Sequence, residues 1–194
     1  MPLSAIIPDS FYNRLAVDVA RDLLGMRLVR RLHGVRLSGI IVETEAYQGE
    51  GDLACHARAG RTARTAAMYG PPGRAYVYFT YGLHWMLNAV CLPEGQPAAV
   101  LVRAIQPLEG IEVIAARRSQ QPSARWTDGP AKICLALGID GTHNGVDLTD
   151  HSGNLWIEWG EPAPDAQVRV GPRMGIERVP EPWRSMPWRM QWVM

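Results

Sequence analysis

Apolar residues recur every four positions near the start of the chain, which predicts an amphipathic helix. These residues are Phe11, Leu15, Val19 and Leu23. Asp9 or Ser10 is suited to cap its first turn, and Gly25 stands where a helix commonly ends. We therefore expect one helix from residue 9 or 10 to about residue 24.

The pattern then changes to a period of two, which is typical of strands. Residues 26–32 and 35–47 form two such segments, separated by the turn signal His33-Gly34. Alternate side chains of a strand point to opposite faces. One face of the second strand is therefore expected to carry Ile41, Glu43, Glu45 and Tyr47.

A second pair of strands is predicted after a long polar stretch. Residues 48–73 are too polar and glycine-rich for regular structure throughout, and a loop of this length is unusual unless it is functional. Residues 74–80 and 83–92 then read as the arms of a hairpin, with Tyr81 and Gly82 at its tip. An aromatic side chain is thus expected at the end of the hairpin.

The rest of the chain continues as mixed α/β. Residues 98–105 are almost wholly apolar until Arg103 interrupts them, and a buried arginine requires a partner. The remaining expected elements are a helix at 108–118, a loop at 120–126, a helix beginning near Pro130, strands at 155–159 and 168–170, and an irregular packed tail at 177–194.

Composition supports one soluble globular domain spanning residues 1–194. Hydrophobic residues make up 47% and charged residues 20%, with a net charge of +1. The first residues do not resemble a signal peptide, and no apolar stretch is long enough to span a bilayer, so we expect a cytoplasmic protein without membrane contact. The 3 cysteines are widely spaced and form no paired ligand motif, which argues against a disulfide framework and a structural zinc site.

Charge is distributed unevenly despite the near-neutral total. No Asp or Glu occurs between Asp52 and Glu94, yet this stretch contains four arginines and several aromatic residues. They are Arg58, Arg61, Arg64, Arg74, Tyr69, Tyr76, Tyr78, Tyr81 and Trp85. A cationic surface with aromatics is typical of proteins that bind a polyanion and stack on its bases. A solvated arginine-rich loop beside an aromatic core hairpin is the alternative.

A series of short motifs resembles the alkyladenine type of 3-methyladenine DNA glycosylase. The motifs cover most of the chain in the order of that family, and as a series they are highly specific. They are Val42-Glu43-Thr44-Glu45-Ala46-Tyr47, His56, Arg61-Thr62, Met68-Tyr69-Gly70-Pro71-Pro72-Gly73, Tyr76-Val77-Tyr78, Tyr81-Gly82, Asn88, Val100-Leu101-Val102-Arg103-Ala104, Pro107-Leu108-Glu109-Gly110 and Gly129-Pro130-Ala131-Lys132.

The resemblance implies a fold and a reaction. The fold would be a single mixed α/β (α+β) domain with a curved, mostly antiparallel sheet, flanking helices and a protruding hairpin that probes DNA. The activity would be base-excision repair: flipping alkylated or deaminated purines out of duplex DNA and hydrolysing the N-glycosidic bond with water. It implies a reaction that uses no metal and no cofactor, and we expect the protein to be a monomer.

The resemblance also assigns roles to individual residues. Glu45 matches the general base that activates water and stabilises the oxocarbenium-like sugar. Arg103 matches the arginine that helps to hold the base and the water. Tyr81 matches the wedge that fills the gap left by the flipped nucleotide. Glu43 is then structural.

The expected base pocket is aromatic. Tyr47, His56 and Tyr78 match walls that stack on the flipped base, and their electron-rich rings would favour cationic alkylated purines. Asn88 matches a residue that discriminates by its bulk against the amino group of guanine. Contacts with the DNA backbone are expected from Arg58, Arg61, Arg64, Arg74 and Lys132.

Two departures from the family pattern stand out. Thr65 occupies a position where the family often has Asn. Residues 182–187 keep only part of a Pro-x-Arg-Phe pattern, near which a main-chain carbonyl of the family helps to fix the catalytic water. Pro187 is the approximate match for that carbonyl.

Two other functions remain open from the residues. One is a nucleic-acid-binding module without catalysis, in which Glu45 and Arg103 would have no reason to lie together. The other is a hydrolase that uses Glu43 and Glu45 as an acid–base pair, roughly 6–7 Å apart on one strand face. A zinc deaminase is excluded, because its His-x-Glu and Pro-Cys-x-x-Cys elements are absent.

Overall fold

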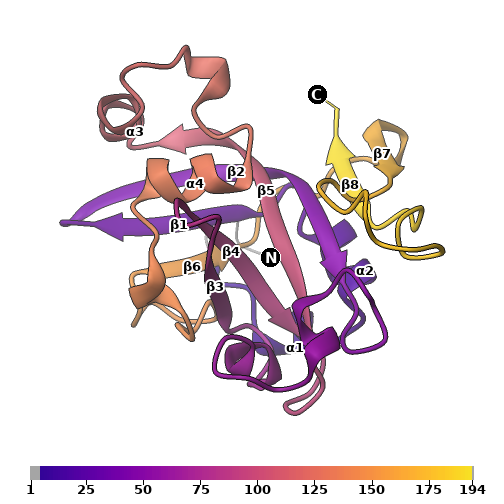
Figure 1. The fold of residues 1–194 in the computed structure, drawn as a ribbon. Helices are drawn as coiled ribbons and strands as arrows, with labels where there is room; N and C mark the ends of the chain where they lie inside the picture. Colours follow the sequence, from indigo (N-terminus) through magenta and orange to yellow (C-terminus); the bar gives the residue numbers. More distant parts are fainter. Residues whose placement is uncertain (1–4, 194) are drawn as a thin grey trace.

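An open, eight-stranded antiparallel sheet forms the centre of the computed structural model, which describes residues 5–193 (Figure 1). Six strands follow the order β3-β4-β5-β2-β1-β6 across the sheet, and β8 pairs with both β2 and β7. The strands are β1 (Arg27–Leu32), β2 (Val35–Tyr47), β3 (Ala75–Thr80), β4 (His84–Cys91), β5 (Ala98–Glu109), β6 (Leu155–Glu158), β7 (Val168–Gly171) and β8 (Arg189–Trp192). The mixed α/β class with an antiparallel sheet is confirmed.

Short helices flank this sheet. Four are α-helical and five are 3-10 turns within the part of the chain that the structure describes. They are α1 (Asp9–Tyr12), α2 (Ala16–Asp22), α3 (Ile111–Arg117), α4 (Pro130–Leu137), η1 (His56–Ala59), η2 (Ala66–Tyr69), η3 (Ser123–Arg125), η4 (Gly141–His143) and η5 (Asp165–Gln167). The expected strand at 98–105 extends to residue 109 and displaces the start of the expected helix at 108–118.

The prediction of one helix to residue 24 was wrong. The chain leaves the helical conformation at Asn13 (ψ 53°) and starts again as α2, whose first N–H, on Ala16, donates to the side chain of Gln48. Leu15 lies in the break and is 53% exposed, so it does not belong to the buried stripe. The break lets Phe11 and the apolar side of α2 both enter the core.

Strand β2 organises the sheet because its two edges receive three partners. Residues 38–47 pair with β5 along one edge. On the other edge, β1 pairs with residues 35–40 and β8 with residues 43–45. The pairing with β5 shifts three times, at Leu108 in β5, at Val42 in β2 and at Arg103 in β5, each of which lacks a direct partner. Such bulges bend a strand and re-aim its side chains.

These bulges correct the predicted face of β2. Ile41 packs in the main core together with Ala46, two positions that a regular strand would place on opposite faces. Glu45 and Tyr47 instead bond to each other on the other side. Ile41 therefore does not share the face of the two carboxylates, because the register shift between positions 41 and 43 moves it to the core side.

The loop at 48–73 has its own packing. Cys55, Met68 and Tyr69 from this loop form a small buried cluster with Tyr76 of β3 and Val90 of β4. η1 and η2 supply local hydrogen bonds within it. The loop is thus a packed layer against one end of the hairpin.

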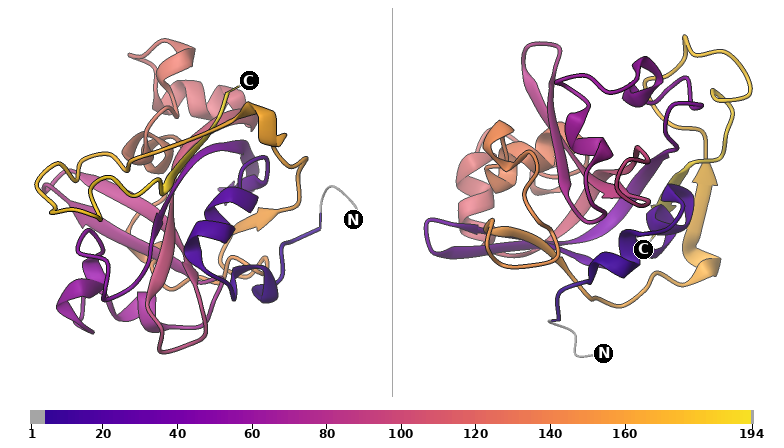
Figure 2. Two further views of the ribbon diagram at one scale, coloured as in Figure 1. Left: turned by 90° about the vertical axis from the view of Figure 1, so that its right-hand side faces the viewer. Right: turned by 90° about the horizontal axis from the view of Figure 1, so that it is seen from below.

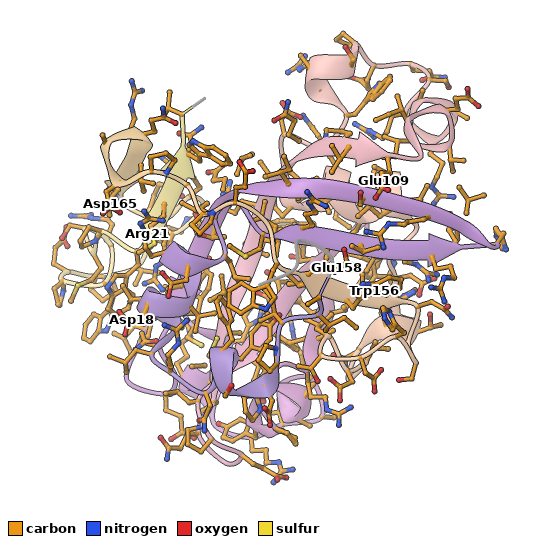
Figure 3. The ribbon with its side chains drawn as sticks, turned by 180° about the vertical axis from the view of Figure 1, so that it is seen from behind. Asp18, Arg21, Glu109, Trp156, Glu158 and Asp165 are labelled. Atoms are coloured by element: carbon orange, nitrogen blue, oxygen red, sulfur yellow. The ribbon has the colours of Figure 1, made fainter. Side chains whose placement is uncertain are left out.

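The tail does not remain irregular as expected. β8 pairs with both β2 and β7, and Figure 2 shows this last strand lying beside the long central one. On the back of the molecule, Arg21 of α2 forms an ion pair with Asp165, which precedes β7 (Figure 3). No helix within residues 5–193 is long and apolar enough to cross a membrane.

Candidate active site

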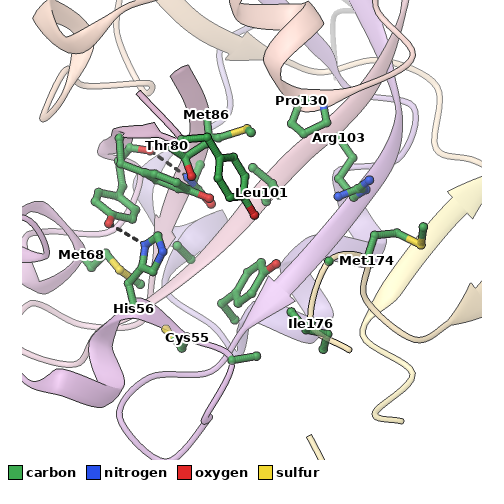
Figure 4. A pocket seen from close by; sticks show the side chains of 18 residues that line it. Cys55, His56, Met68, Thr80, Met86, Leu101, Arg103, Pro130, Met174 and Ile176 are labelled. Atoms are coloured by element: carbon green, nitrogen blue, oxygen red, sulfur yellow. Dashed lines mark hydrogen bonds between the residues drawn. The ribbon is translucent and has the colours of Figure 1, made fainter. Parts of the chain in front are cut away.

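A cavity of about 340 Å³ lies where the end of β2, the loop after it, the β3–β4 hairpin, β5 and residues 174–176 meet (Figure 4). Its lining combines aromatic rings with sulfur-containing side chains and one arginine, Arg103. Tyr47 from β2, His56 from the loop and Tyr78 from β3 are all among the lining residues. A cavity of this size, in which aromatic rings are combined with convergent polar groups, is typical of a small-molecule or base pocket.

The aromatic side of the cavity arises from strand alternation. Tyr76 and Tyr78 are two residues apart in β3, so both rings project to one face, with centroids 5.3 Å apart. The His56 ring meets Tyr78 edge to face at 4.5 Å, and its Nδ1 lies 3.0 Å from the Tyr76 hydroxyl (Figure 4). The expected wall residues His56 and Tyr78 therefore lie together.

The imidazole of His56 is neutral at physiological pH. Burial, together with the nearby guanidinium groups of Arg64 and Arg58, lowers its pKa to about 4. A neutral ring adds no positive charge of its own to this side of the cavity. The pocket can thus accept a cationic ligand without charge repulsion from His56.

Asn88 is buried on β4, directly opposite Tyr76 in the hairpin register. Its Nδ2 donates to the Tyr76 carbonyl at 3.0 Å, which fixes the orientation of the amide. Asn88 also lines the cavity. A fixed amide in the lining is able to discriminate among ligands by size and polarity.

Glu45 lies behind the cavity wall and is fully buried. Two hydrogen bonds and one ion pair hold its carboxylate: the Tyr47 hydroxyl donates at 2.9 Å, the Met174 main-chain N–H donates at 2.7 Å, and the Arg103 guanidinium lies 3.3 Å away. Each of these three residues also lines the cavity, although Glu45 itself does not. The carboxylate is thus one side chain away from a bound ligand.

The environment of Glu45 disfavours its charge on balance. Burial raises its pKa, and the adjacent Arg103, the Met174 N–H and the Tyr47 hydroxyl oppose this effect only in part. A carboxylate with a raised pKa is a stronger base when ionised. Perturbed acids in a cleft are candidates for general acid–base chemistry.

Arg103 reaches the site because it occupies the bulge of β5. Its Nε donates to Glu43 Oε1 at 3.1 Å, and Arg189 from β8 donates to the same oxygen at 3.1 Å. Glu43 is therefore held between two guanidinium groups. It serves as the anchor of Arg103, which does not suit a free acid partner for Glu45.

Tyr81 stands at the tip of the β3–β4 hairpin. It is 85% exposed and adopts a left-handed conformation with φ 53°, in a three-residue turn that also includes Gly82 and Leu83. Its ring lies at the mouth of the cavity. The exposed aromatic tip expected from the sequence is present.

Three of the expected DNA-backbone residues lie in the loop beside the pocket. Arg61 lies over the Tyr69 ring at 5.8 Å and Arg64 over the Tyr78 ring at 5.4 Å. Arg58 donates to the Leu53 carbonyl at 2.8 Å. All three side chains therefore contact residues of the 48–73 loop or of β3 beside the cavity.

The other two expected backbone contacts have carboxylate partners. Arg74 pairs with Asp147 at 3.2 Å, and Lys132 pairs with Asp128 at 2.7 Å. Neighbouring carboxylates reduce the local positive charge. These two residues are weaker candidates for phosphate binding than the three loop arginines.

The two departures from the family pattern have structural outcomes. Thr65 is buried and its hydroxyl donates to the Gly60 carbonyl, which closes the loop between them. Pro187 is exposed and does not line the cavity, whereas residues 174–176, which precede the tail, do. The approximate match of Pro187 to a site carbonyl is therefore not supported by its position.

Sequence reasoning missed three residues of the site. Arg173 is buried against Tyr47, Met174 donates to Glu45, and Arg189 binds Glu43. Residues 171–175 show no periodicity that would mark them. The alternation of apolar Met190 and Trp192 with polar residues was the one available signal for β8.

Metal chemistry has no visible ligand set. Within residues 5–193, no group of three or more His, Cys, Asp or Glu side chains is arranged to hold a metal ion. The 3 cysteines are buried and unpaired as thiols.

Comparison with known proteins gives one consistent result. Residues 10–193 match the family model of methylpurine-DNA glycosylase. A protein of Myxococcus xanthus is 46% identical over 96% of this chain and 89% of its own length. One of Methanocella arvoryzae is 46% identical over 92% and 90%, and one of Carboxydothermus hydrogenoformans is 46% identical over 88% of each. All three carry the name "Putative 3-methyladenine DNA glycosylase".

Proposed function

The chain belongs to the methylpurine-DNA glycosylase family, and we propose that its cavity receives a damaged purine flipped out of duplex DNA. As a family member it is a base-excision repair enzyme, a DNA N-glycosylase acting on alkylated purines such as 3-methyladenine. We further propose that it acts as a monomer on duplex DNA in the cytoplasm and uses no metal or cofactor.

Flipping requires a side chain that takes the place of the extruded nucleotide. Tyr81 is suited to this role because it is the most exposed large hydrophobic side chain in the described chain and stands at the cavity mouth. Wedge residues trade unstacking energy for an opened and bent duplex. Arg58, Arg61 and Arg64, in the loop beside the hairpin, would bind the flanking phosphates.

The flipped base would stack between the rings of Tyr47, His56 and Tyr78. Each ring that stacks on the base is worth roughly 1–3 kcal/mol, which offsets the stacking energy that the base had inside the duplex. Cationic alkylated purines would gain further attraction from the ring faces, and neutral His56 would not repel them. Asn88 would restrict the size of the group that the purine carries beside it.

Hydrolysis would depend on Glu45. Its ionised carboxylate would accept a proton from the attacking water and stabilise positive charge on the sugar as the bond breaks. Arg103 would fix the position of the Glu45 carboxylate relative to the bound base, because it pairs with Glu45 and also lines the cavity. An alkylated purine is already a good leaving group, so little acid catalysis is needed.

One observation carries the proposal: a buried carboxylate is held by Tyr47, Arg103 and Met174, and all three of these also line one aromatic cavity. A binding module without catalysis would not require that arrangement. The 3.3 Å distance between Glu45 and Arg103 therefore favours an enzyme. The Glu43–Glu45 acid–base alternative is disfavoured, because two arginines engage Glu43.

The test is single-turnover release of base from a duplex with one 3-methyladenine or hypoxanthine. Wild type is expected to release the base, and Glu45→Gln is expected to bind the same duplex without releasing it. Glu50→Gln is the matched control, because Glu50 accepts from Tyr69 outside the cavity, and it should keep the wild-type rate. Unchanged turnover by Glu45→Gln would refute the assignment of the base.

A further inference from the structure

Arg173 is a buried charge in the segment between β7 and the tail. Its side chain is 0% exposed, and it belongs to neither a helix nor a strand. A buried guanidinium is costly unless it is paired and hydrogen-bonded. The groups that pair with the Arg173 guanidinium therefore indicate its structural role.

Three segments of the chain meet at this guanidinium. It forms a two-point ion pair with Asp52, with one N–O distance of 2.9 Å. It also donates to the Ala46 carbonyl at 2.9 Å and to the Trp183 carbonyl at 3.3 Å. The end of β2, the loop after it and the tail are thus tied together at one point.

Two aromatic rings enclose the same group. The guanidinium carbon lies 4.7 Å from the Tyr47 ring centroid and 4.9 Å from that of Trp188. Planar guanidinium groups stack well on aromatic faces. One side of the Tyr47 ring is therefore supported by Arg173, while Tyr47 also lines the cavity.

The next residue in the chain reaches the proposed base directly. The N–H of Met174 donates to Glu45 Oε1 at 2.7 Å, and Tyr47 donates to the other carboxylate oxygen. Arg173 therefore lies one residue from one donor to Glu45 and packs against the other. Displacing it would disturb both.

We propose that Arg173 is a positioning residue that holds the stacking face of Tyr47 and the Met174 N–H in place around Glu45. This rests on the proposed function, since it assigns Arg173 a part in the same reaction without contact with the substrate. Stability alone does not account for the residue, because well-packed apolar groups often replace a buried ion pair at no cost.

The experiment compares Arg173→Lys with wild type in single-turnover release of 3-methyladenine across pH, with enzyme in excess over duplex. Lysine keeps the charge but loses the planar stack and the two-point pairing. A misplacement of about 1 Å in a catalytic site costs up to about 100-fold, so we expect a rate about 10- to 100-fold lower.

The pH profile separates positioning from general loss of stability. A hydrogen bond from the Met174 N–H lowers the pKa of Glu45, so loss of its alignment raises that pKa. The acid limb of the rate profile should therefore move to higher pH in Arg173→Lys. A merely destabilised protein would lose active fraction without moving that limb.

Arg36 offers a matched control at the other end of β2. It forms a two-point ion pair with Glu158, and its guanidinium carbon lies 5.9 Å from the Trp156 ring centroid. Figure 3 shows Glu158 and Trp156 together on the back of the molecule. Arg36→Lys repeats the chemical change there and should keep both the rate and the acid limb.

Trp188→Leu is the second variant, in case Arg173→Lys does not fold. It removes one of the two aromatic rings that pack against the Arg173 guanidinium and leaves the ion pair with Asp52 in place. We expect smaller changes in the excision rate and in the acid limb than for Arg173→Lys. Folded variants that keep the wild-type rate and acid limb would overturn the positioning role. No release by wild type would overturn the proposed function itself, whatever the variants do.

Discussion

The ion pair between Asp52 and Arg173 allows a quantitative test of how the tail is held. Both side chains are at most 1% exposed, so removing either partner leaves a buried charge without its counter-charge. Such a loss costs about 3–5 kcal/mol. Asp52→Asn and Arg173→Met should each lower the free energy of unfolding by about that amount.

The double variant should be far less damaged than the two single variants predict together. Removing both charges leaves only the polar groups that the pair had satisfied, chiefly the carbonyls of Ala46 and Trp183. We therefore expect a coupling of roughly 2–3 kcal/mol between the two substitutions. At about 2–4 °C per kcal/mol for a chain of this size, each single variant should melt about 6–20 °C lower.

Urea unfolding of the wild type, both single variants and the double variant measures the cycle. Asp22→Asn is the control, because the Arg14–Asp22 pair has side chains that are 37% and 46% exposed and should contribute less than about 1 kcal/mol. Additivity of the two core substitutions within about 0.5 kcal/mol would refute the reasoning. It would mean that the tail is held by packing alone.

Three further outcomes are expected. Tyr81→Ala should leave the melting temperature almost unchanged, because the ring is 85% exposed, while stopped-flow fluorescence of a fluorescent lesion should show weaker flipping. Burial raises the pKa of Glu45, so the wild-type excision rate should begin to fall, as the pH is lowered, at a pH above the pKa of an ordinary glutamate. A fall that begins only at or below the pKa of an ordinary glutamate would contradict this. Burial raises the pKa of the Cys55 thiol to about 11 and that of Cys134 to about 12, and also raises that of Cys91, so a disulfide reagent at pH 7 should label none until the protein is unfolded.

Local patterns were sufficient for most strands and for the chemistry that local motifs carry. The alternation in residues 35–47 predicted β2 with the bounds that the structure has. The Tyr81-Gly82 pair predicted an exposed aromatic tip, because the residues of a short hairpin turn lie at its end, away from the sheet. Both features depend only on neighbours in the chain.

Features that depend on distant partners were not predictable in the same way. The face of Ile41 followed from the bulge at Val42, which exists only in the pairing of β2 with β5. The break before α2 reflects the need of Phe11 to reach the core, together with a cap from Gln48, 32 residues later in the chain. No period within a short window contains this information.

Two arginines near the C-terminus were missed for the same reason, because their partners lie far away in the chain. Arg173 satisfies Asp52 across 121 residues, and Arg189 reaches Glu43 across 146. A sequence window shows each as an isolated arginine in an irregular segment. Only the folded chain shows that they complete the surroundings of Glu45.

Pairing of β8 with β2 has a consequence for how the enzyme comes into being. A chain emerges from the ribosome N-terminus first, so Glu45 appears early, while Met174 and Arg189 appear near the end of translation. Until then, Glu45 lacks the Met174 N–H and Glu43 lacks the Arg189 guanidinium. A nascent or prematurely terminated chain would thus have the stacking rings and the exposed Tyr81 without an aligned base, which delays activity until the β8 residues that pair with β2, 189–191, have been made. Closing contacts this far apart also costs loop entropy, so this strand pairing is expected to be a late step in folding.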